Sequence, residues 1–81
     1  MLQLVIIPLD AYNALMKKCA ECYLEYPVLK NGFIIRNAEG QQEVHLACDS
    51  ARAIVVFAEE HCPEVAPYMR TVTDAALWPG N

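Results

Sequence analysis

The chain begins with a short apolar segment that lacks the strict alternation of a half-buried strand. Leu4, Val5, Ile6 and Ile7 are consecutive, and Pro8 ends the run. A strand that is apolar on both sides is covered on both sides, and such strands lie in the middle of a sheet. The pattern therefore predicts a central strand that ends at Pro8.

The next segment has the period of a helix with one apolar face. Asp10 offers its carboxylate as an N-cap to free backbone amides, and Pro27 blocks any continuation of the helix. Between them, apolar residues recur at intervals of three and four and form one stripe, which consists of Ala11, Leu15, Cys19, Cys22 and Tyr26. We expect a helix from Ala11 to about Leu24.

Residues 33–36 and 43–48 are predicted to form a β-hairpin. The first segment is rich in aromatic and β-branched residues and follows the turn signal Asn31-Gly32. The second alternates, with Val44, Leu46 and Cys48 on one face and Glu43, His45 and Ala47 on the other. The short loop over residues 37–41 places Phe33 opposite His45 and Ile34 opposite Val44.

A second helix is expected after Asp49 and Ser50, which are both good N-cap residues. Pro63 ends it, and its apolar stripe consists of Ala51, Ile54, Val55, Ala58 and Cys62. Residues 68–73 can form a fourth strand, although the pattern fits both strand and helix over residues 68–74. Residues 71–81 are expected to be a docking or flexible tail, which carries Leu77 and Trp78.

The order strand, helix, strand, strand, helix and last strand is typical of the α+β class. Two right-handed strand–helix–strand units form a ferredoxin-like plait, which is an antiparallel sheet with two helices on one face. In this arrangement the first and third strands are central, which fits the apolar first strand. A chain of 81 residues has room for a single domain over residues 1–81.

The sheet face without helices is the predicted interaction surface. The helices are expected to cover Leu4, Ile6, Ile34, Val44 and Leu46. The opposite face then carries Val5, Ile7, Phe33, Ile35 and Ala47, edged by Glu43 and His45. Such a patch favours a partner, and closed twofold symmetry is the commonest arrangement of two copies. We expect a homodimer through Val5, Ile7, Phe33, Ile35 and His45. The alternative is that Leu77 and Trp78 fold back over this face.

The charge balance excludes some partners. Ten acidic against six basic residues give a net charge of −4, and the charges do not cluster. Binding to a phosphate backbone needs clustered Lys and Arg, so we expect no nucleic-acid partner. No stretch approaches the roughly 18 apolar residues of a membrane helix, and the first residues lack the features of a signal peptide. Four cysteines without a secretory signal favour a cytoplasmic protein with free thiols.

The cysteines and histidines have the spacing of two halves of a zinc site. Cys19-Ala-Glu-Cys22 and His45-Leu-Ala-Cys48 each place two ligand types three residues apart. Cys19 and Cys22 share a helix face, but His45 and Cys48 point to opposite sides of a strand, so four ligands do not converge. We therefore expect no metal, no cofactor and thiols that are packed in the core.

Arg52 lies in the first turn of the second helix, where its charge opposes the helix dipole. One interpretation is that Ser50, Arg52 and free backbone amides bind an anion or the carboxylate of a protein partner. The other is that Arg52 pairs with Asp49 or another acidic neighbour.

These patterns favour a small non-enzymatic protein-interaction or regulatory module, cytoplasmic and homodimeric through its apolar sheet face, with a further protein as partner. No catalytic constellation is recognisable in the sequence. The alternative is a thiol or zinc protein that uses Cys19 and Cys22. A second alternative is a small phage- or plasmid-type inhibitor of a host complex, which the size and acidity of the chain suggest.

Overall fold

The structure of the chain is a computed structural model, which describes residues 2–72. Its elements follow one another as β1 (Gln3–Pro8), α1 (Leu9–Glu21), the 3-10 helix η1 (Pro27–Asn31), β2 (Gly32–Arg36), β3 (Gln42–Cys48), α2 (Ala51–His61), the 3-10 helix η2 (Ala66–Tyr68) and β4 (Arg70–Val72). The predicted α+β order of strands and helices is confirmed.

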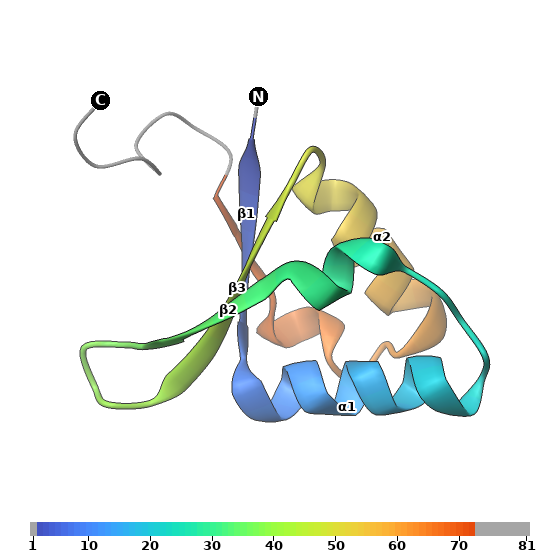
Figure 1. Cartoon of the computed structure of the whole chain (residues 1–81), viewed down its shortest axis with the longest axis horizontal. Helices are drawn as coiled ribbons and strands as arrows, with labels where there is room; N and C mark the ends of the chain where they lie inside the picture. Colours follow the sequence, from blue (N-terminus) through green and yellow to red (C-terminus); the bar gives the residue numbers. More distant parts are fainter. Residues whose placement is uncertain (1, 73–81) are drawn as a thin grey trace.

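The strands form one antiparallel sheet in the order β2-β3-β1-β4. β1 and β3 are therefore central, as the apolar first strand predicts. Figure 1 shows α1 and α2 on the same side of the sheet, which confirms the ferredoxin-like arrangement. We call the sheet face without helices the open face. The turn between β2 and β3 projects away from the helices (Figure 1).

The pairing of β1 with β3 decides which side of β1 faces the helices. Val5 lies opposite Leu46 and Ile7 opposite Val44, and each of these side chains is at most 1% exposed. They form the core under the helices. The prediction that Val5 and Ile7 lie on the open face is therefore wrong. A strand that is apolar on both sides has no alternation to fix its orientation, and the register with the alternating strand β3 fixes it instead.

α1 starts and ends earlier than the sequence pattern predicts. It begins at Leu9, directly after the proline that ends β1, and no side chain caps it. Asp10 lies inside the first turn rather than at the N-cap, because the fixed φ of the proline already starts the helix. The carboxylate still interacts favourably with the helix dipole there. At the other end Tyr23 has a left-handed φ of 55°, and the helix ends at Glu21 instead of Leu24.

α2 begins after its predicted cap. The Ser50 hydroxyl accepts a hydrogen bond from the Ala53 backbone N–H at 3.2 Å, and the helix ends before Pro63. Its predicted stripe faces the core, where the buried residues are Ala51, Ile54, Ala58 and the following Cys62. Leu15 and Cys19 of α1 belong to the same core.

The segment that fitted both strand and helix contains β4, which pairs with β1 through Leu4 opposite Val72 and Ile6 opposite Arg70. Residues 71 and 72 of the expected tail therefore belong to the sheet. Residues 73–81, with Leu77 and Trp78, lie outside the described residues. No helix in residues 2–72 is long and apolar enough to cross a membrane.

Candidate functional site

Three consecutive large apolar side chains of β2 are exposed. Phe33 is 63% exposed, Ile34 60% and Ile35 42%. Because side chains alternate along a strand, Phe33 and Ile35 lie on the open face and Ile34 lies on the helix side. β2 is also an edge strand of the sheet. It therefore presents apolar surface on both sides of an edge.

The open face consists of three rows of side chains that run across the paired strands. The middle row contains Phe33, His45, Ile6 and Arg70. One outer row contains Ile35, Glu43 and Pro8, and the other contains Ala47, Leu4 and Val72. Leu4 and Ile6 were expected under the helices, and their place here follows from the orientation of β1. Phe33, Ile35 and His45 lie on the open face as predicted.

Charged side chains reduce the apolar area in the middle of this face. Arg70 donates a hydrogen bond from Nη2 to Oε2 of Glu43 at 3.4 Å, and this contact reaches across β1 beside Ile6. Ile6 is only 8% exposed. The exposed apolar surface is therefore concentrated on β2.

His45 lies between Phe33 and Ile6 in the middle row. Its Nε2 atom is 3.7 Å from Oε1 of Glu43, which is too long for a hydrogen bond. The atom is buried and has no hydrogen-bond partner in the described part of the chain. The Glu43–His45 pair is thus a loose contact on the sheet surface.

Two of the five predicted interface residues, Val5 and Ile7, belong to the core, and one exposed residue, Ile34, was missed. The sequence placed Ile34 under the helices because it lies opposite the buried Val44. Ile34 is exposed all the same, because β2 is the edge strand of the sheet. The strand order that makes β2 an edge was the signal for finding Ile34.

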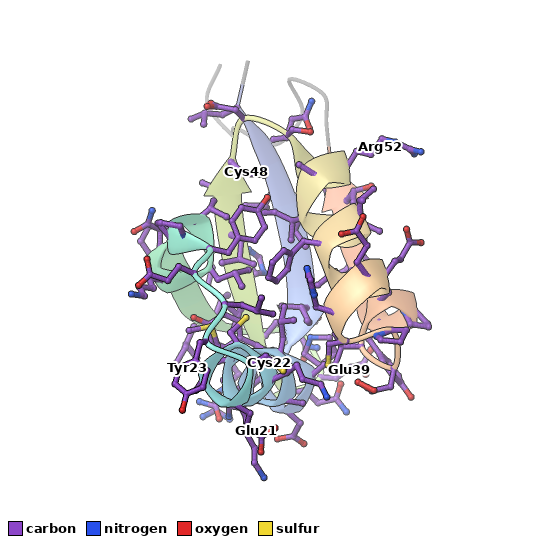
Figure 2. All side chains as sticks on the ribbon, turned by 90° about the vertical axis from the view of Figure 1, so that its right-hand side faces the viewer. Glu21, Cys22, Tyr23, Glu39, Cys48 and Arg52 are labelled. Carbon is purple, nitrogen blue, oxygen red and sulfur yellow. The ribbon has the colours of Figure 1, made fainter. Side chains whose placement is uncertain are left out.

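Two backbone amides at the start of α2 already donate hydrogen bonds to side chains of the chain itself. Ser50 accepts the Ala53 N–H, and the side-chain oxygen of Gln3 accepts the Ala51 N–H at 2.6 Å. Arg52 is exposed, points away from the body of the molecule (Figure 2) and forms no ion pair with another residue in 2–72. An anion at this helix start would have to compete with the bonds to Ser50 and Gln3.

Burial raises the pKa of three of the four thiols. Loss of solvation is the largest cause at Cys19, Cys48 and Cys62. At Cys62 a hydrogen bond from Sγ to Oε1 of Glu64, 2.8 Å long, adds to the effect and the pKa rises to about 11. These thiols are protonated near neutral pH, whereas the thiolate is the nucleophile and the metal ligand. Cys22 is exposed, so the prediction that the thiols are packed in the core is wrong for this cysteine, which lies at the end of α1.

The cysteine and histidine pairs do not meet. His45 lies on the open face and Cys48 is buried on the other side of β3, as their spacing predicts. Figure 2 shows Cys22, at the end of α1, at the opposite end of the molecule from Cys48. Within residues 2–72, no three His, Cys, Asp or Glu side chains are arranged as ligands of one metal ion.

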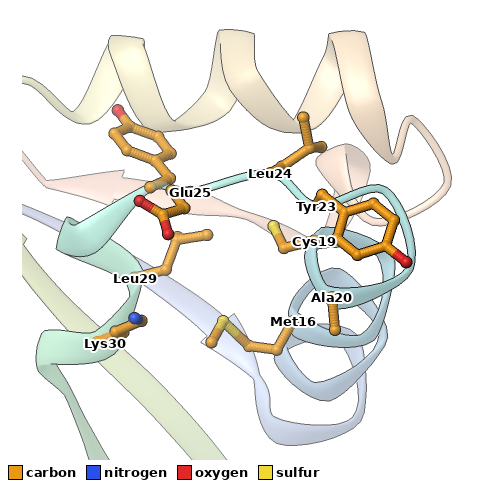
Figure 3. A pocket seen from close by; sticks show the side chains of 9 residues that line it. Met16, Cys19, Ala20, Tyr23, Leu24, Glu25, Leu29 and Lys30 are labelled. Carbon is orange, nitrogen blue, oxygen red and sulfur yellow. The ribbon is translucent and has the colours of Figure 1, made fainter.

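A hollow of about 340 Å³ lies between the end of α1 and η1. Figure 3 shows the side chains around it, with Leu29, Glu25 and Lys30 on one side and Met16, Cys19 and Tyr23 on the other. This volume is near the lower limit of small-molecule sites, which hold roughly 300–1,000 Å³. Its thiol, Cys19, has a raised pKa. The exposed strand β2 is therefore the stronger candidate site.

No family model matches the chain, and neither a curated protein nor a solved structure shows significant similarity to it.

Proposed function

We propose that the chain is a non-enzymatic protein-interaction module that acts as a homodimer and uses β2, with the adjoining open face, as its contact surface. The observation that carries the proposal is the exposure of Phe33, Ile34 and Ile35, which are 63%, 60% and 42% exposed in one short strand. Full burial of an aliphatic or aromatic side chain is worth about 1.5–3 kcal/mol. A contact that covers this strand therefore gains free energy from each of the three side chains.

The edge of β2 lacks the usual protection against pairing. Edge strands of monomeric proteins commonly carry a lysine, a proline or an inward-pointing charge. The middle of β2 is Phe33-Ile34-Ile35, and its one charged residue, Arg36, stands at the end. The guanidinium of Arg36 donates to the Gly40 carbonyl in its own hairpin at 2.9 Å. The strand is therefore suited to a contact with another chain.

A second copy is the partner that this surface fits best. Small domains bury a limited share of their surface, and an isologous contact adds burial on both copies. On the open face Glu43 lies next to Ile35 of β2, and its ion pair with Arg70 extends from there across β1 to β4. This charged area extends beyond the contact through β2, and it is the surface with which we expect a further protein partner to interact.

The state of the cysteines supports a non-enzymatic role in a reducing compartment such as the cytoplasm. All four are free, and three of them are buried thiols with a raised pKa. A thiol of this kind is unreactive near neutral pH. The alternative of a thiol or zinc protein that uses Cys19 and Cys22 therefore has less support than the interaction module.

The proposal is tested by sedimentation equilibrium of the wild-type chain, of Phe33→Asp and of Tyr68→Asp. Tyr68 is the matched control, because it is an aromatic residue with 62% exposure that lies on η2. We expect dimers for the wild type and for Tyr68→Asp, and a monomer with an unchanged far-UV circular dichroism spectrum for Phe33→Asp. A monomeric wild type, or a Phe33→Asp variant that dimerises as tightly as the wild type, would overturn the proposal.

A further inference from the structure

The hairpin fixes the direction of the backbone groups of β2. Asn37 donates its backbone N–H to the Gln41 carbonyl at 2.8 Å, which marks a hydrogen-bonded pair at the end of the ladder. Such pairs alternate along antiparallel strands. Ile35 and Phe33 are therefore bonded to β3 through their backbone groups, and the N–H and C=O groups of Gly32, Ile34 and Arg36 point away from the sheet.

These outward groups form a regular row at a free edge. Within residues 2–72 no strand lies beyond β2, and the strand contains no proline. The outward residues Gly32, Ile34 and Arg36 are spaced evenly, with Ile34 at the centre. A strand that pairs with this edge gains main-chain hydrogen bonds in addition to apolar burial.

We infer that β2 pairs antiparallel with β2 of a second copy, with Ile34 next to the twofold axis, so that the two sheets join into one. This inference rests on the proposed homodimer and names its geometry. Ile34 then forms a hydrogen-bonded pair with the partner's Ile34. Gly32 lies opposite the partner's Arg36, and Arg36 lies opposite the partner's Gly32. All outward groups of the strand are satisfied in this register.

The side chains agree with the same register. Phe33 lies opposite the partner's Ile35 in a pair without hydrogen bonds, where Cα atoms approach to about 4.5 Å and the side chains are closest. Aromatic and β-branched residues are a favourable cross-strand pair. A register centred on Arg36 instead places two guanidinium groups opposite each other, and one centred on Gly32 extends into η1. The register centred on Ile34 pairs the whole of β2.

A disulfide placed on the axis tests this geometry. Cα atoms of a hydrogen-bonded antiparallel pair are about 5.5 Å apart, within the range of about 4.4–6.8 Å that a disulfide spans. The experiment uses Ile34→Cys in a Cys22→Ser background, because Cys22 is exposed and would form cross-links of its own. The control is Thr71→Cys in the same background, since Thr71 is the exposed middle residue of the other edge strand, β4. Oxidised glutathione accepts the two electrons and leaves as two reduced molecules.

We expect Ile34→Cys to form a disulfide-linked dimer within the fraction that is already dimeric by sedimentation, and Thr71→Cys to remain largely uncross-linked. Amide hydrogen exchange on the wild type gives a second measurement that needs no variant. The Ile34 amide should exchange more slowly, by about tenfold or more, in the dimer than after dilution to the monomer.

The possible failures are distinguishable. A wild type that is monomeric by sedimentation overturns both the proposed homodimer and its geometry. A dimeric wild type with an unprotected Ile34 amide, or one in which Thr71→Cys cross-links instead of Ile34→Cys, overturns the pairing of β2 and leaves the homodimer standing.

Discussion

A methyl group placed on Gly32 would lie 2.5 Å from Cγ1 of Val44, which is closer than packed carbon atoms approach. The same methyl group would lie 3.1 Å from Cδ2 of Leu46. Val44 and Leu46 are core residues of β3. Gly32 thus lets the start of β2 pack directly on the core, while the following residues of the strand stay exposed.

Replacement of Gly32 by alanine should lower the free energy of unfolding by about 1–3 kcal/mol, because overpacking forces the buried Val44 side chain to move. Urea denaturation followed by circular dichroism measures the change. In a Val44→Ala background the same substitution should cost less, since the closest atom is then missing. Equal costs in both backgrounds would show that the contact with Val44 is not the cause.

Removal of the α2 cap should also destabilise the fold. Ser50→Ala deletes the oxygen that accepts the Ala53 N–H, and the expected loss of unfolding free energy is about 1 kcal/mol. Arg52→Ala, which changes an exposed side chain two residues after Ser50, is the control and should change stability by less than about 0.5 kcal/mol. A larger effect for Arg52→Ala than for Ser50→Ala would mean that Arg52 has a structural partner.

The four thiols should differ in reactivity. Cys22 is exposed, whereas Cys19, Cys48 and Cys62 are buried, so native protein near neutral pH should take up one iodoacetamide group rapidly and the others only after denaturation. Mass spectrometry of the alkylated chain counts the adducts, and Cys22→Ser should abolish the fast one. Rapid alkylation of Cys19 in the native protein would favour the thiol-protein alternative.

Stability should decrease at alkaline pH. The pKa of Cys62 rises from 9.0 to about 11 in the folded chain, first through loss of solvation and then through the hydrogen bond to Glu64. Below pH 9 both the folded and the unfolded chain keep this proton. Between pH 9 and 11 the unfolded chain releases it first, so the free energy of unfolding falls as the pH rises.

Urea denaturation across this pH range measures the effect, and Cys62→Ala should show a weaker decrease than the wild type. The raised pKa values of Cys19, Cys48 and Tyr26 act in the same direction, so part of the decrease should persist in the variant. Identical pH profiles for the wild type and Cys62→Ala would contradict the assignment to Cys62.

The strand and helix order was predictable because most segments have a clear period. The alternation of Val44, Leu46 and Cys48 gave the right face of β3, and the register of the hairpin, with Phe33 opposite His45, was predicted correctly. The cap at Ser50 placed the start of α2. Each of these features depends on residues close together in the chain.

The candidate site was predicted only in part, because it depends on pairing between distant segments. Leu4 to Ile7 is apolar on both sides, so the sequence could not tell that Val5 and Ile7 face the core. Ile34 lies on the helix side of the sheet, opposite the buried Val44, and it is exposed because β2 is an edge strand. The exposed apolar patch therefore lies at the border of the sheet, whereas the sequence predicted it in the middle.

Native mass spectrometry of the wild-type chain, purified without chelator or affinity metal, tests whether the protein is a metal-free homodimer. It reports the number of subunits and any bound mass in one spectrum. A dimer at micromolar concentration, with no mass beyond two chains, is the result that a homodimeric interaction module predicts. A monomer at all accessible concentrations, or a species that carries stoichiometric zinc, would contradict it.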